Sequence, residues 1–166
     1  WINNGLGKFY DQSNRSLPPL RGRHSFADWA DFDMDGDNDL LLVTKGIPNR
    51  YRAYKNEFCF FLENDGGGIF KKRSLKLLPS IPSHRVYLLD ADANGIPDIL
   101  ILSKKGVHFL IGQGPWKFSD ETTKRLPFFA PFDDMTFGDV NGDGNLDIFG
   151  ILSKNKTGRI WIDKLN

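Results

Sequence analysis

A nine-residue acidic loop occurs three times in this chain, and an apolar run follows each copy at once. The first copy, residues 31–39, reads Asp-Phe-Asp-Met-Asp-Gly-Asp-Asn-Asp; the others span 90–98 and 139–147. Each has Asp or Asn at positions one, three, five and nine, and Gly at position six. Such oxygen donors suit Ca²⁺, which takes about 6–8 oxygen ligands in flexible geometry. Three copies in one frame therefore predict a repeated metal-binding loop.

The loops differ from EF-hand loops, which need a bidentate Glu at position twelve and a helix on either side. Position twelve is Leu42, Ile101 or Gly150 here, and the runs that follow favour β-strands. An alternative stays open, in which the loops are solvated acidic turns held by hydrogen bonds of their own side chains. It carries most weight for the second loop, which contains Ile96 and Pro97. Mg²⁺ is the less suitable ion, because an all-protein cage suits the larger cation.

A second repeated feature is a Gly-rich hairpin. Residues 1–9, 62–70 and 110–118 align without a gap, and each segment ends in Phe. The repeat period is roughly 50–60 residues, the size of a four-stranded propeller blade. We therefore interpret residues 1–166 as a single partial propeller domain. Its repeats are expected at about 1–61, 62–109 and 110–166.

The strands can be placed within each repeat, in the order A to D. In the first repeat we expect strands at 24–32, 39–44, 57–63 and 69–74. In the second we expect them at 85–89, 98–103, 106–111 and 117–121. In the third we expect three strands, at 135–139, 147–152 and 158–163. Strand B is apolar at consecutive positions, which indicates burial on both faces. The fold class is all-β.

Composition and motifs exclude several classes of protein. The single cysteine, Cys59, lies in an apolar run and is expected to be a buried small side chain. No apolar run approaches about 18 residues, so no membrane span is expected. The chain opens at Trp1 without a targeting segment, and we expect a mature or excised piece. No nucleophile elbow, His-Glu-x-x-His or phosphate-binding loop is present, so we expect no enzyme activity.

The pattern Asp-x-Asp-x-Asp-Gly-x-x-Asp followed by Leu or Ile resembles the loops of FG-GAP/VCBS repeats, which form the calcium blades of integrin α-chain propellers. Phe137-Gly138 supplies a Phe-Gly pair before the third loop, and the hairpins are similar to those of VCBS-type propellers. The resemblance implies four-stranded antiparallel blades, about three in this chain, as part of a larger propeller. It also implies an extracellular, cell-surface or periplasmic location.

The resemblance further implies three Ca²⁺ sites, with a backbone carbonyl at position seven of each loop. The ligands in the first loop are Asp31, Asp33, Asp35, Asp37 (carbonyl) and Asp39. In the second loop they are Asp90, Asp92, Asn94, Ile96 (carbonyl) and Asp98. In the third loop they are Asp139, Asn141, Asp143, Asn145 (carbonyl) and Asp147.

Three functions follow as hypotheses. We favour a calcium-stabilised module for extracellular binding or adhesion; the alternatives are a sugar-binding (lectin-type) propeller and an accessory domain of a secreted enzyme. We expect further blades or another subunit against the open blade faces, and no nucleic-acid partner.

Strand order places the A–B and C–D loops on one face and the B–C and D–A loops on the other. The second face gathers basic residues, which predicts a protein or anionic glycan as partner. The basic residues are Arg15, Arg21, Arg23, Lys45, Arg50, Arg52, Lys55, Lys76, Lys104, Lys105, Lys124, Arg125, Lys154 and Lys156.

Overall fold

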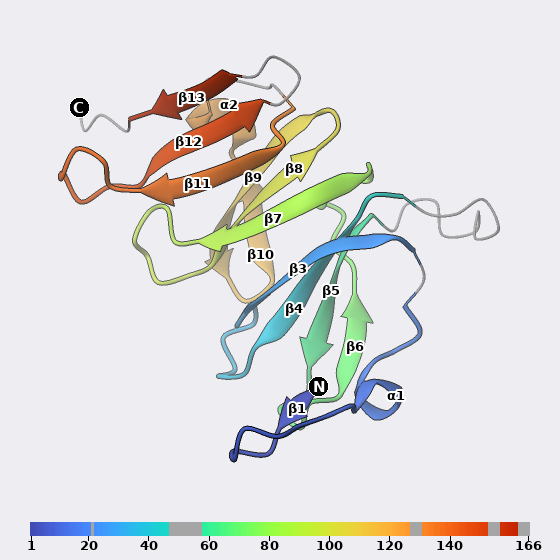
Figure 1. Ribbon diagram of the computed structural model, residues 1–166. Coiled ribbons are helices and arrows are strands. Elements are labelled where there is room, and N and C mark those ends of the chain that lie inside the picture. The colour runs from blue at the N-terminus through green and yellow to red at the C-terminus, as the bar shows by residue number, and fades with distance from the viewer. Residues whose placement is uncertain (21, 47–57, 127–130, 153–156, 163–166) are drawn as a thin grey trace.

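The computed structural model describes residues 1–20, 22–46, 58–126, 131–152 and 157–162. Over these residues the chain is almost entirely β-structure, with a short N-terminal hairpin and three antiparallel sheets (Figure 1). The hairpin pairs β1 (Ile2–Asn3) with β2 (Phe9–Tyr10). Two one-turn helices, α1 (Ser13–Ser16) and α2 (Thr122–Arg125), were not expected, because four residues leave no helical period in a sequence. The all-β prediction is confirmed.

Each sheet pairs its strands in sequential order. The first sheet contains β3 (His24–Ala30), β4 (Asp39–Thr44), β5 (Cys59–Asn64) and β6 (Phe70–Arg73). The second contains β7 (Ser83–Leu89), β8 (Asp98–Ser103), β9 (Gly106–Gly114) and β10 (Lys117–Asp120). The described part of the third contains β11 (Asp134–Gly138), β12 (Asp147–Leu152) and β13 (Thr157–Trp161). Four-stranded antiparallel sheets are confirmed for the first two, and the three sheets form an open arc (Figure 1).

The three B strands, β4, β8 and β12, begin and end where the sequence predicts. Strand β3 ends at Ala30, two residues before its predicted end. The reason is local, because the carboxylate of Asp31 already accepts the backbone N–H groups of Asp35 and Gly36 and so starts the loop.

The core lies between neighbouring sheets. All six residues of β4 and all six of β8 are buried, as their continuous apolar runs predict. Leu41 and Phe61 of the first sheet pack in one cluster with Val86 and Ile99 of the second. A further cluster joins Leu100 and Phe109 of the second sheet to Phe132 and Met135. Cys59 belongs to the first cluster, and burial raises the pKa of its thiol to about 11, so it is an apolar core residue.

The outer faces of the arc differ from each other. Both were expected to be open, and this is wrong for the first sheet, where Leu40, Leu42 and Phe60 are buried. Leu17 and Leu20, in the segment after α1, pack against this face. The outer region of the third sheet does expose apolar side chains, with Phe149 39%, Ile151 44% and Ile160 52% exposed.

The loops sort onto two ends of the sheets, as strand order predicts. At one end, Lys45 donates its backbone N–H to the Arg23 carbonyl, which joins the B–C and D–A connections of the first sheet. At the other end, Asn64, at the start of the C–D hairpin, donates its backbone N–H to Asp39 of the acidic loop. Of the predicted basic residues, those at 21, 50, 52, 55, 154 and 156 lie outside the described residues.

Candidate metal centre

The three acidic loops share one backbone design, built on the aspartate at position one. Asp31 accepts the N–H groups of Asp35 and Gly36, and Asp90 accepts those of Asn94 and Gly95, at 2.8–3.1 Å. Asp139 accepts the N–H groups of Gly142, Asp143 and Gly144 at 2.6–3.2 Å. These bonds curl each loop around its first carboxylate, and in the third loop they hold the pKa of Asp139 below its ordinary value.

Positions four and six of each loop take a left-handed backbone. Gly36, at position six of the first loop, has φ of 96°, a conformation that glycine adopts without a steric penalty. The residue at position four is also in the left-handed conformation, with φ of 65° for Met34 and 55° for Ala93. The third loop has Gly142 at this position, with φ of 79°. The sequence pattern had identified only the glycine at position six.

The aspartate at position nine ties each loop to its sheet. Asp39 accepts the N–H of Phe32 at 3.1 Å and that of Asn64 at 2.8 Å. Asp98 accepts the N–H of Ala91 and that of Gly112, both at 2.7 Å. Asp147 accepts the N–H of Val140 at 2.9 Å. All three carboxylates are buried. A carboxylate has about four lone-pair positions, so two N–H bonds leave room for a cation.

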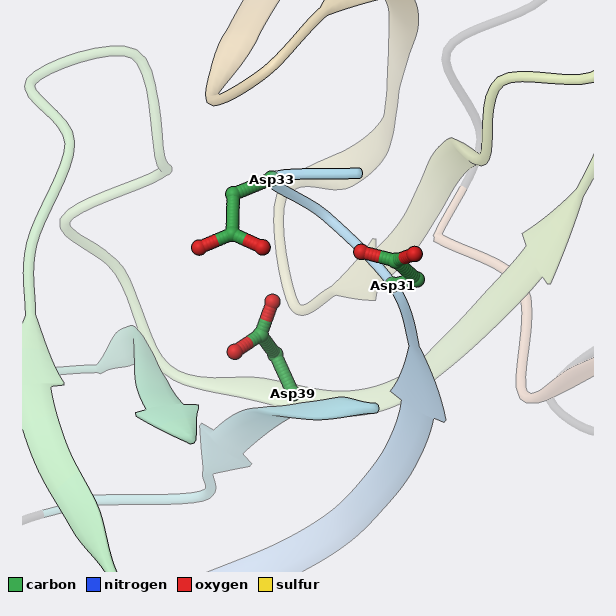
Figure 2. A group of neighbouring side chains, drawn as sticks. All are labelled: Asp31, Asp33 and Asp39. Atoms are coloured by element: carbon green, nitrogen blue, oxygen red, sulfur yellow. The ribbon is translucent and has the colours of Figure 1, made fainter. Parts of the chain in front are cut away.

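Carboxylates gather in the first two loops. The ligand oxygens of Asp31, Asp33 and Asp39 all lie within 4.8 Å of one another, and their carboxylates face a common space (Figure 2). The oxygens of Asp90, Asp92 and Asp98 form a second such group. These are the groups of three acidic side chains with metal-site spacing in the described part of the chain, and each can hold a metal ion.

The third loop forms no such group of three acids, because Asn141 replaces the aspartate at position three. Its amide donates to Asp143 at 2.9 Å and accepts the N–H of Asp143 at 3.1 Å, both within the loop.

The remaining predicted ligands, at positions five and seven, form a tight turn. The side-chain oxygens of Asp35, Asn94 and Asp143 accept the backbone N–H of the residue two positions further on, at 2.7–3.1 Å. Those acceptor bonds hold Asp37, Ile96 and Asn145, whose carbonyls are the predicted ligands at position seven.

The first loop gathers negative charge, and two of its carboxylate oxygens make no hydrogen bond. One carboxylate oxygen of Asp33 and one of Asp37 are buried without a hydrogen-bond partner. Burial and the neighbouring Asp35 raise the pKa of both groups. Burial raises the pKa of Asp39 to about 6, although two N–H groups oppose the shift. A hard divalent cation among these oxygens relieves the repulsion, so the donor set fits a metal ion.

Two neighbours of the loops were missed or misplaced by sequence reasoning. Trp116, in the C–D hairpin of the second sheet, donates its indole N–H to Asp33 at 3.2 Å. Arg125 of α2 lies 3.8 Å from Asp92 and also pairs with Glu121 at 2.6 Å. Arg125 therefore neighbours the second acidic loop, and its assignment to the basic partner face is wrong. Lys124 pairs with the same Glu121.

Sequential antiparallel sheets with acidic A–B loops define a repeat protein of propeller type. Residues 90–150, from the second loop into β12, match the family model described as FG-GAP-like repeat. Residues 90–150 thus form an FG-GAP-like repeat, and the predicted resemblance is confirmed for this segment. No significant match was found among curated proteins or solved structures. Repeats of this family are typically extracellular. No helix in the described ranges is both long and apolar enough to cross a membrane.

Proposed function

We propose that this chain is a calcium-stabilised, non-catalytic propeller module that binds an acidic partner, either a protein or an anionic glycan, outside the cell. The observation that carries the calcium part is the first loop, where three carboxylates converge and an oxygen of Asp33 is buried without a partner. The oxygen-only donor set favours Ca²⁺ over softer metals. The size of the all-protein cage favours Ca²⁺ over Mg²⁺.

The proposal includes three calcium sites of unequal strength. The first loop offers four carboxylates at the ligand positions and the others offer three, so the first site is the tightest. Arg125 weakens the second site further, because its positive charge lies 3.8 Å from Asp92. The third site depends on Asp139, Asp143 and Asp147 with the amide oxygen of Asn141. Affinities on the order of 10⁻⁴ M are typical of extracellular modules.

The role of the ions is structural. Calcium that binds only the folded chain stabilises it by mass action, by about 1.4 kcal/mol per site at a concentration ten times Kd. For a chain of this size that corresponds to a rise in Tm of about 3–6 °C per site. Thermal unfolding in 1 mM Ca²⁺, in 1 mM Mg²⁺ and in excess EGTA measures it directly. A Tm that is the same in Ca²⁺ and in EGTA contradicts the proposal.

The partner part rests on charge at the B–C and D–A end. Lys45, Lys104 and Lys105 are exposed there. Lys45 and Lys104, from neighbouring sheets, line a depression of about 620 Å³ together with His84 and Phe132. Three bound Ca²⁺ would raise the formal net charge of the chain from +1 to +7. A positive, hollowed end favours an acidic partner and speeds its association at low salt.

Retention on a heparin column tests the partner site. The variant carries Lys45→Glu, Lys104→Glu and Lys105→Glu. The matched control carries Lys8→Glu, Lys71→Glu and Lys117→Glu, the same charge change at exposed positions next to the C–D hairpins. We expect the variant to elute at lower salt than the control. Equal elution of the two would show that heparin responds to net charge alone. Binding of neutral sugars on a glycan array, independent of salt, would favour the lectin-type alternative.

A further inference from the structure

The first acidic loop is contacted by the neighbouring sheet. The C–D hairpin of the second sheet crosses to this loop, and Trp116 makes two hydrogen bonds with it. Its backbone N–H donates to the carbonyl of Phe32, at position two of the loop, at 2.9 Å. Its indole N–H donates to the Oδ2 atom of Asp33, at position three, at 3.2 Å. One residue of the second sheet therefore holds both the backbone and a ligand side chain of a loop in the first.

The indole is itself held in place from several sides. Its ring lies 5.2 Å from the ring of Phe61 in a T-shaped contact and 6.0 Å from that of Phe32, between ring centroids. The guanidinium carbon of Arg73 lies 4.6 Å from its centroid. Trp116 has φ of 53°, a left-handed conformation that costs on the order of 1 kcal/mol or more in a bulky residue. The surrounding contacts maintain that conformation, so the indole N–H has a fixed direction.

We propose that Trp116 is a positioning residue for the first metal site, and that it couples metal binding to the docking of the second sheet on the first. The inference rests on the proposed function, because it takes the first loop to be a calcium site. The indole occupies Oδ2 of Asp33, while Oδ1 is the buried oxygen without a hydrogen-bond partner. A carboxylate fixed in this way presents one free oxygen to the cation and loses little rotamer freedom when the ion binds.

The other two loops are arranged differently at position three. In the second loop, the neighbour of Asp92 is the charged guanidinium of Arg125, which competes with a cation. In the third loop, Asn141 bonds to Asp143 of its own loop. Among the described residues, the first loop is thus the one whose position-three side chain accepts a neutral donor from a neighbouring sheet. Calcium binding at the first loop should strengthen the contact between the sheets, and loss of that contact should weaken calcium binding by the same factor.

Calcium titration calorimetry of the full chain tests the inference with Trp116→Phe, which removes the N–H and keeps an aromatic ring. We expect the affinity of the tightest site to fall on the order of tenfold, since loss of an outer-shell partner typically costs 10–100-fold. The matched control is Trp29→Phe, which also removes an indole from the region of the first sheet but bonds to no loop carboxylate in the contacts described. If Trp116→Phe does not fold, Trp116→3-benzothienylalanine replaces the N–H by sulfur and preserves the ring shape.

A double-mutant cycle separates positioning from general damage. In an Asp33→Ala background the ligand that the indole orients is gone, so Trp116→Phe should no longer change the affinity of the site. An unchanged affinity in Trp116→Phe alone, or an equal loss in both backgrounds, would overturn the inference. These results differ from failure of the proposed function, which would appear as no calcium binding by the unmodified chain.

Discussion

The loop aspartates have two separable roles, and Asp98→Ala distinguishes them in the absence of metal. Asp98 is fully buried and accepts the N–H of Ala91 and that of Gly112, both at 2.7 Å. The bond from Gly112 joins the second loop to β9, and the bond from Ala91 closes the loop on itself. Asp90 accepts the same number of N–H bonds in the same loop, but it is exposed together with the two residues that donate them. Asp90→Ala is therefore the matched control.

The expected cost follows from burial. Each N–H left without an acceptor in the interior costs about 1–3 kcal/mol. Two such groups give about 2–6 kcal/mol, from which the relief of a buried charge must be subtracted, since burial raises the pKa of Asp98 above its ordinary value. We expect a net loss of about 2–4 kcal/mol for Asp98→Ala, or about 5–15 °C in Tm. Water replaces the carboxylate in Asp90→Ala, so that variant should lose less than about 1 kcal/mol.

Urea unfolding in excess EGTA measures both variants without any contribution from calcium. Unfolding in Ca²⁺ then gives the metal contribution, which both variants should lose at the second loop. We expect Asp98→Ala to be less stable than Asp90→Ala in EGTA, and equal stability of the two would refute a structural role for Asp98. Equal stability would mean that burial of the ninth-position carboxylate has no structural effect apart from metal binding.

Three further predictions concern single side chains. Arg125→Gln should tighten calcium binding at the second loop about fivefold in calorimetry, because a positive charge near Asp92 repels the ion by about 1 kcal/mol. Asp134→Asn should cost about 1 kcal/mol in urea unfolding at pH 7, because it breaks a two-bond ion pair with Arg85 that joins the second and third sheets. Arg85 holds the pKa of Asp134 below its ordinary value of 3.8, so this contribution is present above that pH and should disappear as pH falls through the lower, folded-state value. Leu20→Ala should cost about 1–2 kcal/mol in the same assay, since this half-buried side chain covers the first sheet.

The predictable parts of the structure are those that repeat. Strand B has the same limits in sequence and structure in all three sheets, because it begins at the last residue of an acidic loop with a fixed glycine. The aspartate at position nine is the first residue of each B strand, so loop and strand define each other's limits. The A and C strands were placed less accurately, because side-chain capping by Asp31 and the continuation of β9 to Gly114 have no signal in the apolar pattern.

Contacts between sheets could not be predicted from the repeat. Trp116 and Asp33 are 83 positions apart, and nothing in the acidic-loop pattern indicates that the hairpin of one sheet reaches the loop of the sheet before it. Arg125 was assigned by its place between strands D and A, yet a long side chain on a one-turn helix reaches back to Asp92. The order of the strands determines where the backbone of a loop lies. The position of the charged group at the end of a long, flexible side chain depends instead on the charges within its reach.

The two outer faces show why an apolar pattern alone does not predict an exposed surface. Strands β4 and β12 both follow an acidic loop, and both place apolar residues on both of their faces. In β4 the residues that face away from the second sheet are buried, because the chain before β3 turns back and packs Leu17 and Leu20 against them. In β12, Phe149 and Ile151 are exposed. Gly150 lies between them on the opposite face, and a Cβ atom at this position would lie only 2.7 Å from the ring of Phe132. The inner face of the third sheet is therefore fitted closely to its neighbour, while its outer face keeps the apolar surface that a further blade or subunit would cover.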